Sequence, residues 1–280
     1  MMKKNVLITG ASSGIGKECA KLFTEKGLQV IAVSRNKDKM HDLEQIGCLV
    51  FSMDITQEES IKNGFEQIFA KVNQIDILIN NAGFTQNGFL EELTIDQLRY
   101  QFEVNIFGLI RITQMILPKM RAAKQGTIIN VGSAGGDFTS AGASAYHASK
   151  YALESFTDGM RQELAHFGIN VILIKPGGVE TDFLKNAESF YPKPIAENPY
   201  GKMRENFLKM LSTILDTKNS SFPILKAAEV ADAIYKSSIA SNPKTRIRVG
   251  KTAKMMPWVK RLMSDKGFDK MIMSQLGLLK

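Results

Sequence analysis

Near its start the chain reads Val6-Leu7-Ile8-Thr9-Gly10-Ala11-Ser12-Ser13-Gly14-Ile15-Gly16. A short apolar run is followed by a turn with three glycines, and the residues after the turn have helical periodicity. Glycine is required where backbone must come close to a pyrophosphate or to another backbone, and a helix that begins there offers free N–H groups. The spacing is GxxxGxG rather than the common GxGxxG, and a plain structural turn explains three glycines about equally well. The loop alone is therefore consistent with, but not specific for, a site for dinucleotide phosphates.

Similar apolar runs recur along the chain and predict the fold class. They are apolar on both faces, as the strands of a parallel sheet covered by helices are, and segments of helical periodicity separate them. This alternation predicts an α/β fold with a doubly wound, Rossmann-type parallel sheet. The strands expected from apolar runs lie at 6–8, 30–33, 49–51, 77–79, 127–131 and 171–174, and the expected helices at 17–25, 95–121, 148–166 and 227–239. Residues 245–249 alternate Arg246 and Arg248 with apolar residues, which predicts a further strand with one polar face.

The regular alternation stops after Ile174. Residues 182 to about 223 contain four prolines among aromatic and charged residues, and an insertion this long between sheet elements is usually functional or mobile. We therefore predict one Rossmann-type domain over residues 1–250, with a helical substrate lid at about 182–223. Residues 251–280 are predicted to form a basic, amphipathic helical extension.

The composition excludes several classes of protein. The chain has 280 residues, 44% of them hydrophobic, which is enough to form a core without disulfides. Cys19 and Cys48 are too few for a disulfide framework and fit a reduced compartment. The chain begins without the apolar segment of a secretory signal, and no stretch reaches the ~20 apolar residues that span a bilayer. We expect a cytoplasmic protein, and no cluster of His, Asp, Glu and Cys predicts a metal site.

Two further motifs accompany the glycine loop. Asn80-Asn81-Ala82-Gly83 follows the fourth expected strand, and Asp54-Ile55 ends the third. With Thr9 before the glycines, they make the chain resemble the short-chain dehydrogenase/reductase family from Lys4 to about Val249. Within the family it is most similar to the hydroxysteroid- and retinol-dehydrogenase-like branch. The resemblance implies a nicotinamide dinucleotide cofactor, with the adenine beside Asp54 and one ribose near the Asn80–Gly83 motif.

The resemblance also implies a role for the segment after the sixth strand, 176–181. It matches the family's PG-x-V-x-T element, in which a threonine and backbone groups bind the nicotinamide carboxamide. A proline-glycine turn that leaves a strand is an equally valid description of the same residues. The residues assigned to cofactor binding so far are Gly10, Ser12, Ser13, Gly14, Ile15, Gly16, Asp54, Ile55, Asn81, Ala82, Gly83, Tyr146, Lys150, Pro176, Gly177, Val179 and Thr181.

The end of the second strand indicates which dinucleotide is bound. An acidic residue there accepts hydrogen bonds from the ribose hydroxyls of NAD, whereas the additional 2′-phosphate of NADP needs a cation. This chain has no acid at that place and carries Arg35, whose guanidinium can hold a phosphate through two hydrogen bonds. NADP(H) is therefore favoured, and the alternative is that Arg35 is a solvated surface charge.

Tyr146 and Lys150 are four residues apart, which places both on one face of a helix. A phenol with a pKa near ~10 is a poor acid or base at neutral pH, so a neighbouring cation is needed to favour the phenolate. Ser133 follows the fifth expected strand, where its hydroxyl can hydrogen-bond a reacting carbonyl oxygen. Asn105 matches the family's fourth catalytic position, which is thought to hold a water connected to the lysine. Together these residues predict the catalytic set Ser133, Tyr146, Lys150 and Asn105.

The set implies reversible hydride transfer between a ketone or aldehyde and an alcohol. In reduction we expect Tyr146 to protonate the oxygen, Ser133 to polarise it and Lys150 to lower the pKa of the tyrosine. His147 is the next residue after the tyrosine but points about 100° away from it on the helix. A structural role is therefore favoured for His147 over substrate contact.

The lid supplies several aromatic and methionine side chains, which suit a small lipophilic carbonyl or alcohol substrate. Two alternatives stay open: an NADP(H)-binding sensor without catalysis, and a β-ketoacyl carrier-protein reductase. The latter usually ends soon after the last strand, so the extension from Lys251 argues against it. No motif predicts binding of nucleic acid. The family's usual assemblies imply a homodimer or homotetramer.

The net charge of +8 is concentrated at the end of the chain. From Thr245 to Lys280 there are nine basic and two acidic residues, which leaves about +1 for the rest of the chain. Trp258 and several methionines lie among these basic residues. Such a segment can lie on an anionic membrane surface, and it can also pack against its own body or a partner subunit.

Overall fold

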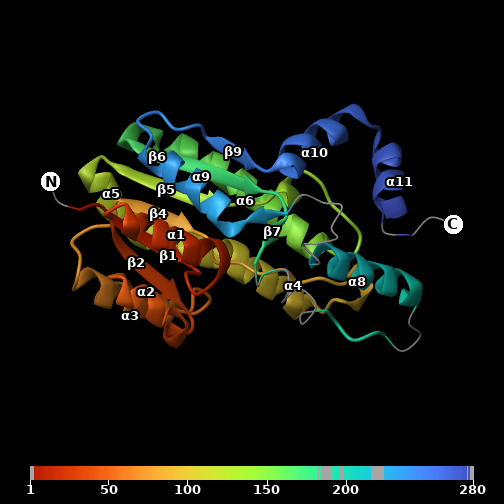
Figure 1. Cartoon of the computed structure of the whole chain (residues 1–280), viewed down its shortest axis with the longest axis horizontal. Coiled ribbons are helices and arrows are strands. Elements are labelled where there is room, and N and C mark those ends of the chain that lie inside the picture. Colours follow the sequence, from red (N-terminus) through yellow and green to blue (C-terminus); the bar gives the residue numbers. More distant parts are fainter. Residues whose placement is uncertain are drawn as a thin grey trace.

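The computed structural model describes residues 3–181, 183, 191–195, 199–215, 224–275 and 277. Its centre is a parallel sheet of seven strands in the order β3-β2-β1-β4-β5-β6-β9 (Figure 1). Strands β2 and β3 are added on one side of β1, and the chain then crosses over to place β4 on the other side of β1. The direction in which strands are added therefore reverses between β1 and β4. In open α/β sheets such a switch point forms a crevice at the carboxyl ends of the strands. The strands are β1 Asn5–Thr9, β2 Gln29–Ser34, β3 Leu49–Ser52, β4 Ile77–Asn80, β5 Gly126–Val131, β6 Ile169–Pro176 and β9 Arg246–Val249.

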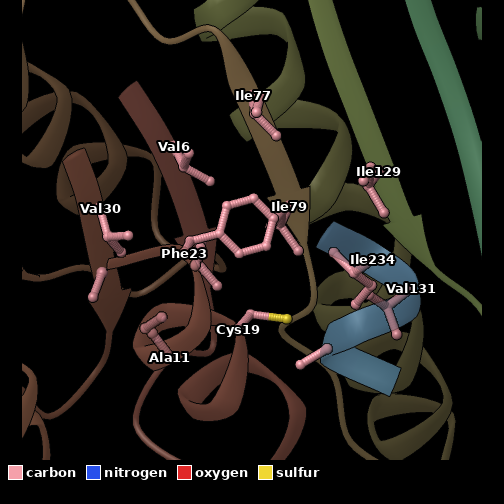
Figure 2. Packing of buried hydrophobic residues seen from close by; sticks show 14 of the residues in the cluster. Val6, Ala11, Cys19, Phe23, Val30, Ile77, Ile79, Ile129, Val131 and Ile234 are labelled. Atoms are coloured by element: carbon pink, nitrogen blue, oxygen red, sulfur yellow. The ribbon is translucent and has the colours of Figure 1, made fainter. Parts of the chain in front are cut away.

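Alternate side chains of each strand enter opposite helical layers, which explains why the strands are apolar on both faces. Val6 and Ile8 pack toward helices α1 and α9, whereas Leu7 packs toward α3 and α5. Figure 2 shows Phe23 of α1 and Ile234 of α9 among the strand side chains of the first layer. The helices of this layer are α1 Gly14–Glu25, α2 His41–Gln45 and α9 Ala227–Ile239, and those of the other are α3 Glu58–Phe69, α5 Leu109–Ala123 and α6 Ser144–Leu164.

The seven expected strands are confirmed, and the expected helix over 95–121 is confirmed as one continuous helical segment that contains a π-helical turn. The segment 95–121 was predicted as a single helix. It consists of α4 (Ile95–Phe102), a π-helical segment η3 (Glu103–Gly108) and α5. Gly108 explains the local geometry in part, because a Cβ there would lie 2.7 Å from the carbonyl oxygen of Ile55. The wider turn thus occurs where the helix touches the loop after β3.

The segment after β6 is more regular than its prolines indicate. Its described part contains α8 (Gly201–Leu215), and a second, two-stranded sheet pairs β7 (Val179–Glu180) before α8 with β8 (Leu225–Lys226) after it. The rest of the predicted lid, residues 182, 184–190, 196–198 and 216–223, lies outside the described residues. Short 3-10 turns complete the fold: η1 Lys37–Met40, η2 Leu90–Glu92, η4 Ala134–Gly136 and η5 Ala165–Phe167.

The C-terminal extension forms two helices, α10 (Lys251–Leu262) and α11 (Asp265–Gln275). Both lie at the same end of the molecule as α8 (Figure 1). A separate apolar cluster joins the three helices through Phe207 and Leu211 of α8, Val259 of α10 and Phe268 of α11. One side of the extension therefore packs against its own chain. This is one of the two arrangements that the sequence allowed for the basic tail, the other being contact with a membrane.

Candidate active site

The glycine loop lies at the switch point of the sheet, directly after β1. Asn81, which follows β4, holds the loop in place, because its side-chain amide donates to the carbonyl oxygens of Thr9 at 3.0 Å and Gly10 at 3.2 Å. In return the Thr9 hydroxyl accepts from the backbone N–H groups of Asn81 and Ala82 at 3.0 and 3.1 Å. Two motifs about seventy residues apart are thus one structural unit, with Gly83 next to it.

Glycine is required at two positions of the loop, and the helix that follows directs its positive end toward the loop. A Cβ at Gly16 would overlap the carbonyl oxygen of Gly10, and a Cβ at Gly14 would lie 2.9 Å from Cγ2 of Thr181. Ser13 precedes the first turn of α1, and its side chain does not cap the helix. That turn contains no acidic residue, so the positive end of the helix faces the half-buried loop without a competing carboxylate. Ser12 and Ile15 lie in the same half-buried stretch.

Arg35 follows β2 directly and is exposed at the rim of the same crevice. Its guanidinium donates one hydrogen bond, 3.2 Å long, to the hydroxyl of Tyr100. Asp54 follows β3, and its carboxylate accepts from the N–H and hydroxyl of Thr56 at 2.9 and 2.8 Å. Next to it, Ile55 is buried. These residues lie at the ends of neighbouring strands, as the sequence predicted.

Tyr146 and Lys150 are one turn apart at the start of α6. The ammonium of Lys150 lies 5.8 Å from the centre of the Tyr146 ring and donates to the carbonyl oxygen of Val131 at 3.0 Å. Ser133 precedes η4, and its hydroxyl accepts from the backbone N–H of Gly135 at 3.0 Å. It also forms a hydrogen bond with the Tyr146 side chain. Three of the four residues predicted to be catalytic therefore converge at the carboxyl end of β5.

Burial shifts the pKa values of both α6 residues. It raises the pKa of Tyr146 to about 12, and only the hydrogen bond with Ser133 acts in the opposite direction. It lowers the pKa of Lys150 to about 8. Desolvation therefore determines the Tyr146 pKa in the protein without bound ligands, and the expected lowering by Lys150 stays a prediction for the occupied site. The physical reason is that desolvation penalises the charged forms of both groups, and the Lys150 ammonium is directed at the Val131 carbonyl.

Asn105 lies in the π-helical segment and is buried. Its amide oxygen accepts from the backbone N–H of Phe84, and its amide nitrogen donates to the carbonyl oxygen of Phe84 and to Ser149. Ser149 in turn donates to the carbonyl oxygen of Tyr146 at 2.7 Å. Asn105 thereby joins the segment after β4 to the first turn of α6, and π-helical turns frequently occur at functional sites.

His147 has a structural environment, as the sequence favoured. Its Nδ1 is 2.8 Å from the carbonyl oxygen of Gly135, and its Nε2 is 3.3 Å from the hydroxyl of Ser140. Burial lowers the pKa of His147 below the usual range. The ring thus fixes the loop after Ser133 against α6.

The segment after β6 reaches back to the glycine loop. Pro176 ends β6, the N–H of Gly177 donates to the carbonyl oxygen of Val249, and Val179 is buried in β7. The Thr181 side chain then lies against Gly14. The elements predicted to bind the dinucleotide phosphates and the nicotinamide carboxamide are consequently neighbours.

A buried ion cluster beneath the site escaped the sequence analysis. Lys175, the residue before Pro176, is fully buried, and its ammonium pairs with Asp137 at 2.6 Å and with Glu154. Arg246 and Arg248 of β9 pair with the same two acids, each at 3.3 Å. Asp137 lies just after η4 and Glu154 one turn after Lys150, so the cluster joins the Ser133 loop to α6. Only the alternation of Arg246 and Arg248 with apolar residues indicated that β9 has a polar face.

A second buried pair fixes the described part of the lid. Arg204 of α8 pairs with the buried Glu92 at 2.6 Å and lies over the ring of Tyr191. Closer to the predicted catalytic set, the ring of Phe183 is 5.7 Å from that of Tyr146. An aromatic side chain therefore lies beside the predicted catalytic tyrosine.

Among the described residues, no helix is long and apolar enough to cross a membrane. The same part of the chain contains no group of three or more His, Cys, Asp or Glu side chains arranged to hold a metal ion. Cys19 and Cys48 are buried free thiols.

Comparison with known proteins identifies clear relatives. Residues 4–192 match the model of the short chain dehydrogenase family. The chain is 33% identical to 3-ketodihydrosphingosine reductase of Bacteroides thetaiotaomicron, over 89% of each protein. It is 30% identical to NADPH-dependent 3-dehydrocapnine reductase of Ornithobacterium rhinotracheale, over 98% of this chain and 97% of that protein. Among solved structures, a short-chain dehydrogenase from Streptomyces avermitilis superposes with a TM-score of 0.78 at 30% identity, covering 93% of each chain.

Proposed function

Because the chain belongs to the short-chain dehydrogenase/reductase family of oxidoreductases, which act on alcohol and carbonyl groups, we propose that it reduces a lipophilic ketone or aldehyde with NADPH. The observation that carries the proposal is the convergence of Ser133, Tyr146 and Lys150 beside the dinucleotide crevice. The hydroxysteroid- and retinol-dehydrogenase-like branch is not singled out by the relatives, so we assign no branch.

Tyr146 is suited to donate a proton. With its pKa raised to about 12, the phenol is fully protonated at neutral pH and can protonate the oxygen of a carbonyl as negative charge develops there. Ser133 can donate to the same oxygen, because its hydroxyl already lies within hydrogen-bonding reach of the phenol. When bound, the cofactor supplies the hydride that reaches the carbonyl carbon.

Lys150 has a different role in this proposal. A pKa of about 8 means that the ammonium can both hold and release a proton near neutral pH. It can therefore stabilise the phenolate left after Tyr146 has given up its proton, and can help to restore that proton. Asn105 acts as a positioning residue, since it contacts Ser149 and the backbone of Phe84 rather than Tyr146.

The choice of NADPH over NADH rests on Arg35. It follows β2 at the rim of the crevice, and the position has no carboxylate that would bind ribose hydroxyls or repel a 2′-phosphate. A guanidinium that now donates only to an exposed tyrosine hydroxyl can turn to a phosphate at little cost. One relative is itself named as NADPH-dependent, which supports the same choice.

The lipophilic substrate is supported by the walls in front of Tyr146. Phe183 faces the tyrosine ring, and the apolar cluster around Phe207 lies on the buried loop residue Ala143 just before α6. Such walls favour an apolar ligand with one polar group near Ser133. Two relatives are named as reductases of a 3-keto and a 3-dehydro compound. We therefore propose residues 182–223 as the substrate lid of a catalytic domain over residues 1–250, followed by the extension 251–280.

We further propose a homodimer or homotetramer in the cytoplasm. The described chain exposes an apolar groove along α4 and η3, lined by Ile95, Leu98, Phe102 and Phe107, and Phe156 of α6 is also exposed. Exposed apolar surface of this kind favours association. Buried free thiols at Cys19 and Cys48 fit a reduced compartment.

The test is NADPH oxidation by the purified protein with a panel of ketones and aldehydes of increasing chain length. The proposal predicts that kcat/KM rises with the apolar length of the substrate and is higher with NADPH than with NADH. Cofactor binding without turnover of any carbonyl would favour the sensor alternative. Turnover restricted to acyl thioesters would favour a carrier-protein reductase.

A further inference from the structure

The outer face of α10 has a composition that the catalytic proposal does not explain. Its inner side carries the fully buried Ala253 together with Met256 and Val259, which pack onto α8 and α11. The outer side exposes large apolar side chains to solvent: Trp258 is 64% and Leu262 82% exposed, and Met255 is similarly open. The helix is thus apolar on both sides, although only one side has a partner among the described residues.

Basic side chains border this exposed apolar stripe. Lys251, Lys254 and Arg261 are all exposed, and none of them pairs with a carboxylate in the part of the chain that the structure describes. At helical spacing they lie on the same face as the apolar residues. Residues 251–262 contain no acid. Lys260 differs, because it faces inward to Asp265 at 3.0 Å and lies over the ring of Phe268.

We propose that this outer face of α10, formed by Lys251, Lys254, Met255, Trp258, Arg261 and Leu262, binds the surface of an anionic phospholipid bilayer. Exposed apolar side chains bordered by cations are complementary to an anionic lipid surface. The apolar side chains enter the headgroup region, and the cations form ion pairs with the lipid phosphates. A tryptophan is the side chain best suited to that boundary. The face is one side of a single helix, and its exposed apolar side chains lie beside cations that are unpaired among the described residues, rather than beside the paired acids and bases of a protein interface.

The position of α10 relates the surface to the active site. Its inner side belongs to the apolar cluster that also contains Phe207 of α8 and Phe138 of the loop after Ser133. Phe138 in turn contacts His147, the neighbour of Tyr146. A bilayer bound by α10 would therefore lie on the same end of the molecule as the lid, yet lipid binding itself requires no catalysis.

Trp258 is the only tryptophan of the chain, which makes the test direct. The full-length protein is mixed with vesicles of phosphatidylglycerol and phosphatidylcholine, or of phosphatidylcholine alone, and both sedimentation and tryptophan emission are measured. We expect sedimentation with the anionic vesicles, a blue shift of the emission, and reversal of both by high salt. The triple variant K251E/K254E/R261E should bind roughly a hundredfold more weakly or worse.

The matched control is the triple variant K4E/K39E/K71E, which reverses three exposed lysines far from α10 in the sequence. It should keep most of the binding, although its net charge changes by the same amount. The unfolding midpoints of both variants in urea establish that each is folded. Equal loss of binding in the two variants, equal binding to phosphatidylcholine alone, or no sedimentation of the wild type would each overturn the proposal.

Discussion

Replacing Lys150 with methionine should inactivate the protein and at the same time stabilise it. Burial lowers the pKa of Lys150 from 10.5 to about 8, and each unit corresponds to about 1.4 kcal/mol between folded and unfolded states. At pH 7 the buried ammonium therefore reduces the free energy of unfolding by about 3 kcal/mol. Loss of the hydrogen bond to the Val131 carbonyl offsets about 1 kcal/mol of the gain. We expect Lys150→Met to be more stable by about 2 kcal/mol at pH 7.

The pH dependence distinguishes this cause from better packing. Between the folded pKa near 8 and the unfolded value, the unfolded chain binds more protons at this site, so wild-type stability rises with pH. The variant lacks this contribution. Its advantage should therefore shrink from pH 8 upward, reach zero at about pH 9.5 and become a deficit of about 1 kcal/mol by about pH 10.5, where only the lost hydrogen bond remains.

The assay is urea unfolding of the cofactor-free protein at several pH values, followed by circular dichroism. Other groups titrate equally in both proteins and cancel in the difference. Lys71→Met is the control, because it removes an exposed ammonium and should change stability little at any pH. A gain that is independent of pH, or a loss of stability at pH 7, would refute the reasoning about the buried Lys150 ammonium.

Three further changes test other parts of the structure. Arg35→Ala should weaken NADPH binding at least tenfold and NADH binding little, measured by titration of cofactor fluorescence, and equal losses would contradict the NADP assignment. Lys175→Met leaves two buried carboxylates without their central cation, so the free energy of unfolding in urea should fall by about 3 kcal/mol; an unchanged value would show that the arginines of β9 suffice. Ile95→Asp places an acid at the first turn of α4, where it suits the helix, and should convert the oligomer to a monomer in light scattering, whereas an unchanged mass would exclude the α4 groove as interface.

The sheet could be predicted from sequence because six of its strands contain short apolar runs bounded by polar or glycine residues, and the seventh, β9, alternates arginine with apolar residues. The π-helical turn could not, since Phe102, Ile106 and Leu109 continue the apolar pattern through it. The turn depends instead on the contact of Gly108 with the backbone of Ile55, which is a tertiary interaction. The sequence also predicted a helical lid at about 182–223 but did not give the bounds of α8 within it.

In the candidate site, too, local sequence patterns could be predicted and contacts between distant residues could not. The glycine loop and the Tyr146–Lys150 pair are local patterns with a chemical reason for their spacing, and the structure brings their residues together. The pairing of Arg204 with Glu92 joins residues 112 positions apart, and no local pattern records such a contact. The same holds for Lys175, whose sequence neighbours are apolar and whose acids come from other elements. The direction of the Tyr146 pKa shift was also not predictable, because it is set by burial. The four-residue spacing of Tyr146 and Lys150 contains no information on how deeply either side chain is buried.

The central claim is that Tyr146 protonates a carbonyl substrate beside bound NADPH. The most direct measurement compares wild type and Tyr146→Phe for turnover of the best ketone of the panel and for NADPH affinity. Because general acid catalysis contributes on the order of a hundredfold to ten-thousandfold, we predict that kcat falls by at least a hundredfold while the NADPH Kd changes by less than about twofold. A variant that keeps kcat within tenfold of wild type would contradict the account.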